Sequence, residues 1–143
     1  MIELKASGFA KWIGEAAKKL QSGTQQALSR TAEAAATYAK LSRLYKSHTY
    51  GLRSSIHTKV GTGQAIVSAN ARYASWVENG TRPHVIVPRR KTWLRFEQAG
   101  QIRFAKSVQH PGTQPRPFMR EAQHKATPLF ERLVHDAVRN AFQ

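Results

Sequence analysis

The chain has 143 residues, of which 41% are hydrophobic and 22% charged, with 23 Lys and Arg against 8 Asp and Glu (net +15) and no cysteine. These values predict one folded domain over residues 1–143, and they exclude wholesale disorder, disulfides and thiolate-based sites. The positive charge favours a polyanion or an acidic protein as partner. No apolar run approaches the roughly 20 residues of a membrane span, and the N-terminus lacks a signal-peptide pattern. We therefore expect synthesis in the cytoplasm and no membrane contact.

The first predicted element is helical, because apolar residues between Phe9 and Tyr45 recur every three or four positions. The stretch "QSGT" interrupts this pattern. Gly23 costs about 1 kcal/mol relative to alanine inside a helix, and Thr24 could cap a new helix. Either one long bent helix or two helices in tandem is therefore expected. The alanine-rich "AEAAATYA" that follows suits close packing against a sheet or a neighbouring subunit.

From Leu52 the period changes to two, which indicates strands. A first β-hairpin is predicted on either side of the "GTG" at Gly61 to Gly63. Before this turn Ser54, Ile56, Thr58 and Val60 share one face, and after it Ala65, Val67 and Ala69 alternate with other residues. A second hairpin is predicted on either side of "QAGQ", with apolar positions at Leu94, Phe96, Ile102, Phe104 and Val108. Between the hairpins we expect a short helix, ended at Asn79-Gly80 by a left-handed cap, and a short strand "HVIV".

The C-terminal part begins with "HPGTQPRPF", whose prolines and glycine predict an extended loop. Pro117 suits the first position of a helix, and an amphipathic pattern follows from Phe118 to Phe142. Pro128 lies inside that pattern, so we expect a kink or a fresh start capped by Thr127. The predicted fold is α+β: a long N-terminal helix, two antiparallel hairpins forming a small sheet, a short connecting helix, and a C-terminal helix packed on the sheet.

Catalysis has little support in the sequence. Glu78 with His84 or His110 could form a hydrolytic pair, but Glu78 and Glu97 are the only acidic residues between His48 and Pro117. A glutamate just before an Asn-Gly turn more often pairs with arginine or caps backbone N–H groups. We therefore predict a structural role for Glu78 and no enzyme activity.

The histidines do not form a metal-binding pattern either. No pair is spaced i, i+4 and no His-Glu-x-x-His occurs, so no metal or other cofactor is expected. His110 precedes Pro111 and Gly112, where an imidazole ring can hydrogen-bond a loop backbone, and we predict that it braces this loop. The six histidines are His48, His57, His84, His110, His124 and His135.

Nucleic-acid binding is the stronger alternative. Residues 48–117 carry 11 basic and 2 acidic side chains, and "PRRKTWLRF" with the second hairpin could place cations beside aromatic rings. Against it, Trp93 and Arg95 would share one strand face, whereas Leu94, Phe96 and the other hydrophobic residues are expected in the core. No recognition helix, zinc finger or RNP motif occurs.

Three ordered blocks resemble one known family. They are "YGLRSSI" (Tyr50 to Ile56), "RYASWVENGTRPHVIVP" (Arg72 to Pro88) and "VQHPGTQPRPFMREA" (Val108 to Ala122). They are similar to the tail-completion, or head-tail joining, proteins of long-tailed bacteriophages, also called minor tail or neck proteins. The resemblance covers about residues 1 to 140, but the basic "VPRRKTW" has no counterpart in it. The family block "YA-x-x-x-E-x-GT" matches Tyr73, Ala74, Glu78, Gly80 and Thr81, and "HPGT-x-x-RPF" matches His110 to Thr113 and Arg116 to Phe118.

This resemblance implies a non-enzymatic structural protein of the virion neck, which forms a ring, expected to be a hexamer, between capsid connector and tail tube. The implied partners are further copies of the chain, the tail tube or tail terminator protein, and the head-closure or connector protein, with double-stranded DNA in passing contact in the channel. An isolated subunit would then expose apolar surface. The alternative is a basic nucleic-acid-binding module that uses the central hairpins.

The residues in the matched blocks are predicted to serve folding or interfaces. We expect Tyr73, Trp76 and Val77 to insert the short helix into the core, and Glu78 to pair with Arg116 or Arg82. Gly80, before Thr81, should adopt a positive φ.

The remaining candidates lie in the loops. Arg89 and Arg90 are expected in a projecting loop that touches another ring or subunit. Pro111, Gly112, Pro115 and Pro117 should shape the loop before the last helix. Phe118 should anchor that helix, and Arg116 is predicted to be a buried cation.

Overall fold

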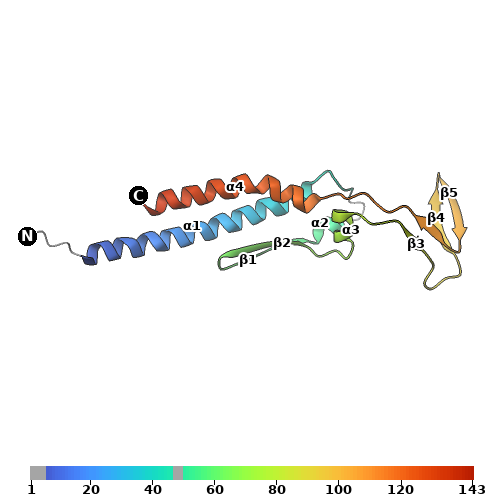
Figure 1. Cartoon of the computed structure of the whole chain (residues 1–143), viewed down its shortest axis with the longest axis horizontal. Coiled ribbons are helices and arrows are strands. Elements are labelled where there is room, and N and C mark those ends of the chain that lie inside the picture. The colour runs from blue at the N-terminus through green and yellow to red at the C-terminus, as the bar shows by residue number, and fades with distance from the viewer. Residues whose placement is uncertain (1–5, 47–49) are drawn as a thin grey trace, which may run out of the picture. The chain divides into compact units, whose positions relative to one another are not determined.

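The computed structural model describes residues 6–46 and 50–143, and the fold is α+β as predicted (Figure 1). Contacts divide the chain into a first unit, Met1–Ala74 with Pro117–Gln143, and a second unit, Ser75–Arg116. The expectation of a single domain over residues 1–143 stays a prediction. The elements are α1 (Ala6–Leu41), α2 (Gly51–Ser54), β1 (Ile56–Gly61), β2 (Gln64–Ala69), α3 (Ala74–Asn79), β3 (His84–Ile86), β4 (Leu94–Gln98), β5 (Gln101–Ala105), β6 (Val108–His110) and α4 (Phe118–Ala141).

In the first unit α1 is one continuous helix, so "QSGT" does not divide it. Thr24 is not a cap, because its hydroxyl donates to the Leu20 carbonyl one turn earlier (2.9 Å). Gly23 has a packing role instead. A Cβ built on Gly23 would lie 2.7 Å from the Cβ of Ala137 in α4, closer than two carbon atoms can approach. The glycine therefore lets the two helix backbones come together.

This close approach predicts opposite effects for two glycines of the same helix. Gly23→Ala gains about 1 kcal/mol of helix propensity but overpacks the contact with Ala137, which typically costs 1–3 kcal/mol, so we expect a net loss of up to about 2 kcal/mol. Gly14, where an added Cβ would meet nothing within 4 Å, is the matched control, and Gly14→Ala should gain about 1 kcal/mol. Urea denaturation measures both values, and equal stabilisation by the two alanines would contradict the packing role.

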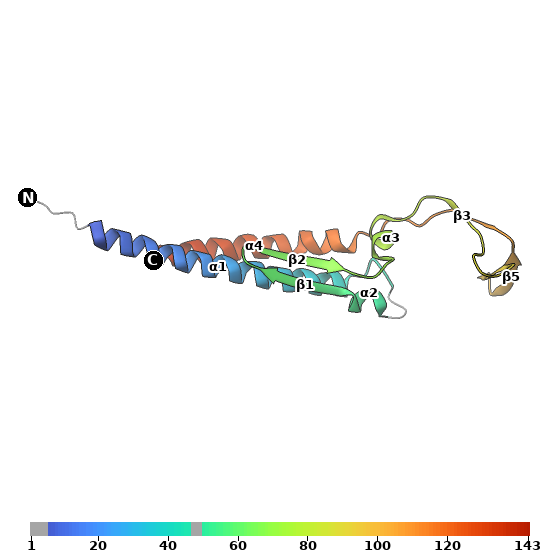
Figure 2. The same cartoon turned by 90° about the horizontal axis from the view of Figure 1, so that it is seen from below.

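Helices α1 and α4 lie side by side (Figures 1 and 2), and mostly small side chains are buried between and around them. This allows a short distance between the helices but a thin core. Only Phe118 and Ile56 are large side chains that are fully buried among the described residues. The buried alanines are Ala16, Ala27, Ala32, Ala36, Ala39, Ala74, Ala122, Ala126, Ala137 and Ala141.

The predicted first hairpin is confirmed as β1 and β2, which pair antiparallel and contact α1 (Figure 2). Its first strand begins at Ile56 and not near Leu52, because Leu52 and Ser54 lie in α2. Gln25 of α1 holds its turn: the Nε2 donates to the Gly61 carbonyl (2.7 Å), and the Oε1 accepts from the Gly63 N–H (3.0 Å). One amide side chain thus satisfies two backbone groups at the turn, which places the hairpin along the middle of α1.

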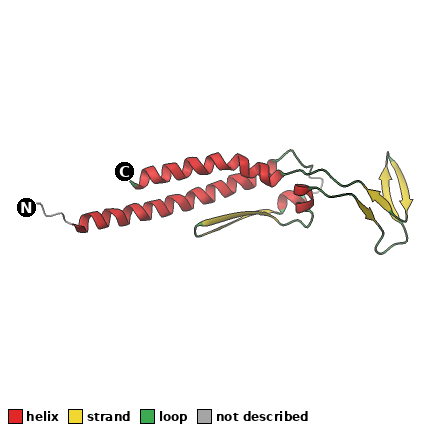
Figure 3. Ribbon diagram, viewed as in Figure 1, coloured by secondary structure: helices red, strands yellow, loops and turns green. Residues whose placement is uncertain are grey.

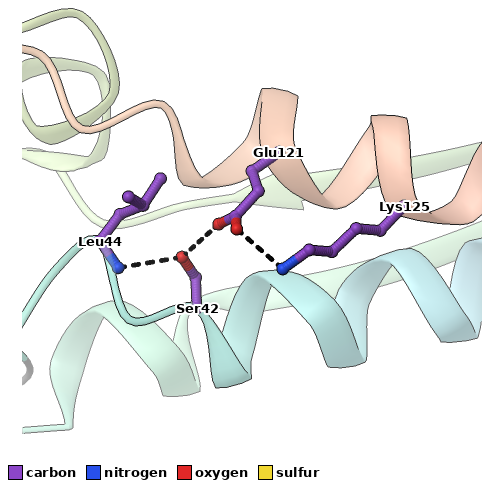
Figure 4. Close-up of polar contacts among 4 residues, drawn as sticks. All are labelled: Ser42, Leu44, Glu121 and Lys125. Carbon is purple, nitrogen blue, oxygen red and sulfur yellow. Dashed lines mark hydrogen bonds and ion pairs between the residues drawn. The ribbon is translucent and has the colours of Figure 1, made fainter.

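A polar cluster joins the end of α1 to the start of α4 (Figure 4). The buried Ser42 hydroxyl donates to Glu121 Oε2 (2.8 Å) and accepts from the Leu44 N–H (3.2 Å). The Lys125 ammonium lies 2.7 Å from Glu121 Oε1. The hydrogen bond from Lys125, and then that from Ser42, lower the pKa of Glu121, because both favour the charged carboxylate.

The lowered pKa sets the pH dependence of this cluster. The unfolded chain binds the proton more tightly, so the contribution of Glu121 to stability is complete above the ordinary glutamate pKa of about 4.3 and is lost as pH falls through the lower folded value. We expect the stability gap between the native chain and Glu121→Gln to shrink in that window, measured by thermal unfolding at several pH values. Glu131→Gln, an exposed position on the same helix, is the control, and a gap that persists in acid would exclude this mechanism.

The arrangement differs from the prediction in several details. The strands form three separate two-stranded sheets, β1-β2, β3-β6 and β4-β5, rather than one small sheet (Figure 3), because the segment after α3 pairs with the segment before the proline loop. Helix α4 packs chiefly on α1. It also runs through Pro128 without a fresh start, and Thr127 donates to the Gln123 carbonyl (2.9 Å) instead of capping. The helix thus continues despite the roughly 3 kcal/mol cost of an internal proline, and Ala126 and Ala137 are buried on either side of Pro128.

Candidate functional site: the glycine-threonine clasp

Within the second unit, the two Gly-Thr dipeptides of the sequence blocks meet each other. Thr81 N–H donates to the Thr113 carbonyl (3.0 Å) and Thr113 N–H to the Thr81 carbonyl (3.1 Å). Their hydroxyls lie 3.1 Å apart, and the Thr81 hydroxyl also accepts from the Thr113 N–H (3.0 Å). We call Gly80, Thr81, Gly112 and Thr113 the glycine-threonine clasp. It joins two segments that are 32 residues apart in the chain.

Both glycines of the clasp are required by the backbone. Gly80 has φ 71°, as predicted, and Gly112 has φ 88°, values that side-chain-bearing L-residues rarely adopt. A Cβ on Gly80 would collide with the Thr113 carbonyl oxygen and lie 2.8 Å from Pro115 N, and one on Gly112 would collide with the Thr81 carbonyl oxygen. Each glycine thus makes room for the opposite strand of the clasp.

Strands β3 and β6 extend the clasp by pairing His84 with His110. The two imidazole rings stack, with centroids 5.1 Å apart. His110 Nδ1 accepts from the Gly112 N–H (3.0 Å), which confirms the predicted bracing of the loop. His84 Nδ1 lies 2.9 Å from the Arg82 carbonyl, an acceptor only, so this nitrogen carries the proton. Each imidazole ring therefore hydrogen-bonds a backbone group of its own loop.

The predicted roles of the aromatic and cationic neighbours are corrected. Trp76 is 60% exposed and Tyr73 41%, so neither inserts α3 into a core. Ala74 is the buried residue of α3, and Trp76, two positions on, projects about 200° around the helix from it. Arg116 is exposed rather than a buried cation. It acts through its backbone, because its N–H donates to the Val77 carbonyl (2.8 Å) and ties the proline loop to α3.

The predicted anchor of the last helix is confirmed in the first unit. Phe118 is 1% exposed, and its ring meets Tyr45 edge-on at 4.9 Å. The Tyr45 hydroxyl donates to the Ala39 carbonyl (2.9 Å), and burial raises the pKa of Tyr45. Pro117 precedes α4 as its N-cap rather than as its first residue.

Several predicted roles are not tested by the contacts in the structure. Arg89 and Arg90 are exposed between β3 and β4, and their contact with another ring or subunit stays a prediction. The same holds for the pairing of Glu78 with an arginine, and for Pro111 and Pro115 as the residues that shape the loop. His48 lies outside the described residues.

In the β4-β5 hairpin the sequence prediction assigned Ile102 and Phe104 to the wrong face. Its two-residue turn, Ala99-Gly100, has φ 52° and 75°, which is the type I′ geometry typical of tight hairpins. This turn pairs Arg95 with Phe104 and Glu97 with Ile102. Since paired residues share a face, Ile102 and Phe104 lie with Arg95 and not with Leu94 and Phe96. Counting the pairs outward from "AG" would have predicted this register.

One face of this hairpin thus combines cations with apolar side chains, and we call it the Phe104 face: Arg95, Glu97, Ile102 and Phe104, with Trp93 and Lys106 at its end. The Lys106 ammonium lies over the Trp93 ring, 5.3 Å from its centroid. The sequence prediction had placed Trp93 and Arg95 together but had missed Ile102 and Phe104.

In the part of the chain that the structure describes, no three His, Asp or Glu side chains lie close enough together to bind a metal ion. Within residues 6–46 and 50–143, no helix is both long and apolar enough to span a bilayer. Comparison with models of known protein families, with curated proteins and with solved structures gave no match.

Proposed function

We propose that this chain is a structural virion protein that forms a ring at the head-tail junction and completes or joins a phage tail to the connector. The observation that carries the proposal is the direct pairing of Thr81 with Thr113. The two motif blocks of the family resemblance meet there, and their glycines and threonines serve backbone construction rather than chemistry.

Exposed apolar side chains in both units support the proposal. A ring subunit must bury apolar surface against its neighbours, and contiguous exposed apolar groups often mark such contacts. Phe9 stacks on Trp12, which contacts Phe142, yet these residues are 66%, 46% and 55% exposed. We infer that this cluster at the ends of α1 and α4 faces another subunit in the assembled ring.

The test is the mass of the purified protein by light scattering, alone and with tail tubes, at low and high salt. We expect a ring or a tube-bound complex that does not respond to duplex DNA. Trp12→Ser should lower the assembled fraction, whereas Ser22→Ala, an exposed position on the same helix, should not. A monomer that ignores tail tubes under all these conditions would exclude the proposal.

A nucleic-acid-binding module is the second candidate, and the positive charge of the second unit, with 8 Lys and Arg against 2 Asp and Glu, favours it. Clustered lysines and arginines neutralise phosphates and bind nucleic acid independently of its sequence. The same light-scattering experiment separates the two functions. A monomer that binds DNA with a steep dependence on salt and ignores tail tubes would favour the second.

A further inference from the structure

The Phe104 face is an open surface of the second unit that mixes apolar and cationic side chains. Trp93, Ile102 and Phe104 are 48%, 55% and 63% exposed, and Arg95 and Lys106 are exposed beside them. Large aromatic side chains and arginine are the residue types that dominate binding energy at protein interfaces. A hairpin of two strands is marginally stable alone, so a partner that covers this face would also stabilise the hairpin.

We propose that the Phe104 face docks onto an acidic protein surface that presents apolar side chains bordered by carboxylates. The proposal rests on the proposed function for where this partner is found, among the proteins of the tail and connector. The docking chemistry itself follows from the second unit. Arg95 and Lys106 would meet carboxylates, while Ile102 and Phe104 would pack on the apolar side chains between them.

Charge argues against a second copy of this chain as the occupant. The second unit carries 8 Lys and Arg against 2 Asp and Glu. Two such surfaces in contact would place like charges in one interface, which costs affinity. An acidic partner reverses this sign, and opposite charges also accelerate the encounter of the two proteins.

The composition of the face argues against nucleic acid. Glu97 shares the face, directly opposite Ile102, but its carboxylate repels phosphates and carboxylates alike, so the apolar side chains distinguish the two partners. Ile102 has no π-face on which a base could stack. The Trp93 ring already has the Lys106 ammonium over it, whereas single-stranded nucleic acid needs open aromatic faces. A protein surface with apolar side chains can pack on Ile102 and does not need the open indole face.

The experiment compares two charge reversals on opposite faces of the same hairpin. Arg95→Glu lies on the Phe104 face, and Arg103→Glu, paired with Phe96, lies on the other. Both change the net charge equally. The probes are a labelled peptide of Glu-Glu-Phe repeats, a peptide of Glu-Glu-Ser repeats and a labelled oligo-dT, each titrated with the full chain by fluorescence anisotropy.

We expect the Glu-Glu-Phe peptide to bind more tightly than the Glu-Glu-Ser peptide and the oligo-dT. Arg95→Glu should weaken that binding by about tenfold or more, and Arg103→Glu by less than about threefold. If both variants lost the same affinity for the Glu-Glu-Phe peptide, net charge alone would explain the binding, and the proposal would be overturned. Tighter binding of oligo-dT, or no binding of the Glu-Glu-Phe peptide, would also overturn it.

Two further measurements keep the result interpretable. The first is NMR detection of the cross-strand contact between the backbones of residue 95 and Phe104, which are paired in the hairpin. This contact in both Arg95→Glu and Arg103→Glu establishes that the hairpin keeps its register. Arg95→Gln is the milder variant if the reversal unfolds the hairpin, and it should still weaken the Glu-Glu-Phe peptide more than Arg103→Gln does. Peptide binding that depends on Arg95, in a protein that forms no ring and ignores tail tubes, would exclude the proposed function while supporting the acidic docking surface.

Discussion

Replacing Gly112 with alanine is expected to destabilise the second unit by about 2–5 kcal/mol and to open the glycine-threonine clasp. Two costs combine. An L-residue in the left-handed region costs roughly 1–2 kcal/mol, and overpacking typically adds 1–3 kcal/mol, because the new Cβ would collide with the Thr81 carbonyl oxygen and lie 3.0 Å from the Arg82 carbonyl carbon. The collision is with backbone, which cannot move aside as a flexible side chain would.

Gly63 is the matched control for this prediction. It has φ 72°, and an added Cβ there would meet nothing within 4 Å, so Gly63→Ala should show the backbone strain alone, roughly 1–2 kcal/mol. Hydrogen exchange of the Thr81 and Thr113 amides, which form the reciprocal hydrogen bonds of the clasp, should accelerate in Gly112→Ala and stay unchanged in Gly63→Ala. Unchanged exchange in both variants would mean that the clasp relaxes without opening.

Phe118→Ala should destabilise the first unit by about 3–5 kcal/mol, the usual cost of removing a fully buried aromatic ring. Phe118 is one of two large side chains fully buried in the described chain, and most of the remaining core is alanine, so the surrounding helices have few large side chains with which to fill the cavity. The lost edge-on contact with Tyr45 at 4.9 Å accounts for roughly 0.5–1.5 kcal/mol of this loss.

Phe142→Ala, beyond the other end of α4, is the comparison. Phe142 is 55% exposed, so its removal should cost about 1 kcal/mol or less in the isolated chain. Urea denaturation followed by far-UV circular dichroism reports both values. If Phe142→Ala proved as costly as Phe118→Ala, the core would have to lie elsewhere than between Tyr45 and the start of α4.

The sequence by itself determined the elements that depend on local interactions. The helical period and the alternating period predicted α1, α4 and the hairpins, because the spacing of apolar residues within one segment depends on whether that segment is a helix or a strand. Turn chemistry predicted the positive φ of Gly80, and the position of His110 before Pro111 and Gly112 predicted its bond to the loop backbone. These features involve residues only a few positions apart.

The tertiary structure decided the features that depend on distant segments. In the sequence Gly23 has the appearance of a helix breaker, and only its contact with Ala137 shows its packing role. The two Gly-Thr sequence blocks likewise gain a shared structural role only through the pairing of Thr81 with Thr113. The exposure of Trp76 and Arg116 and the placement of Phe104 beside Arg95 were mispredicted in the same way. Burial and face depend on what packs against a residue and in which register, and a local pattern of apolar residues does not carry that information.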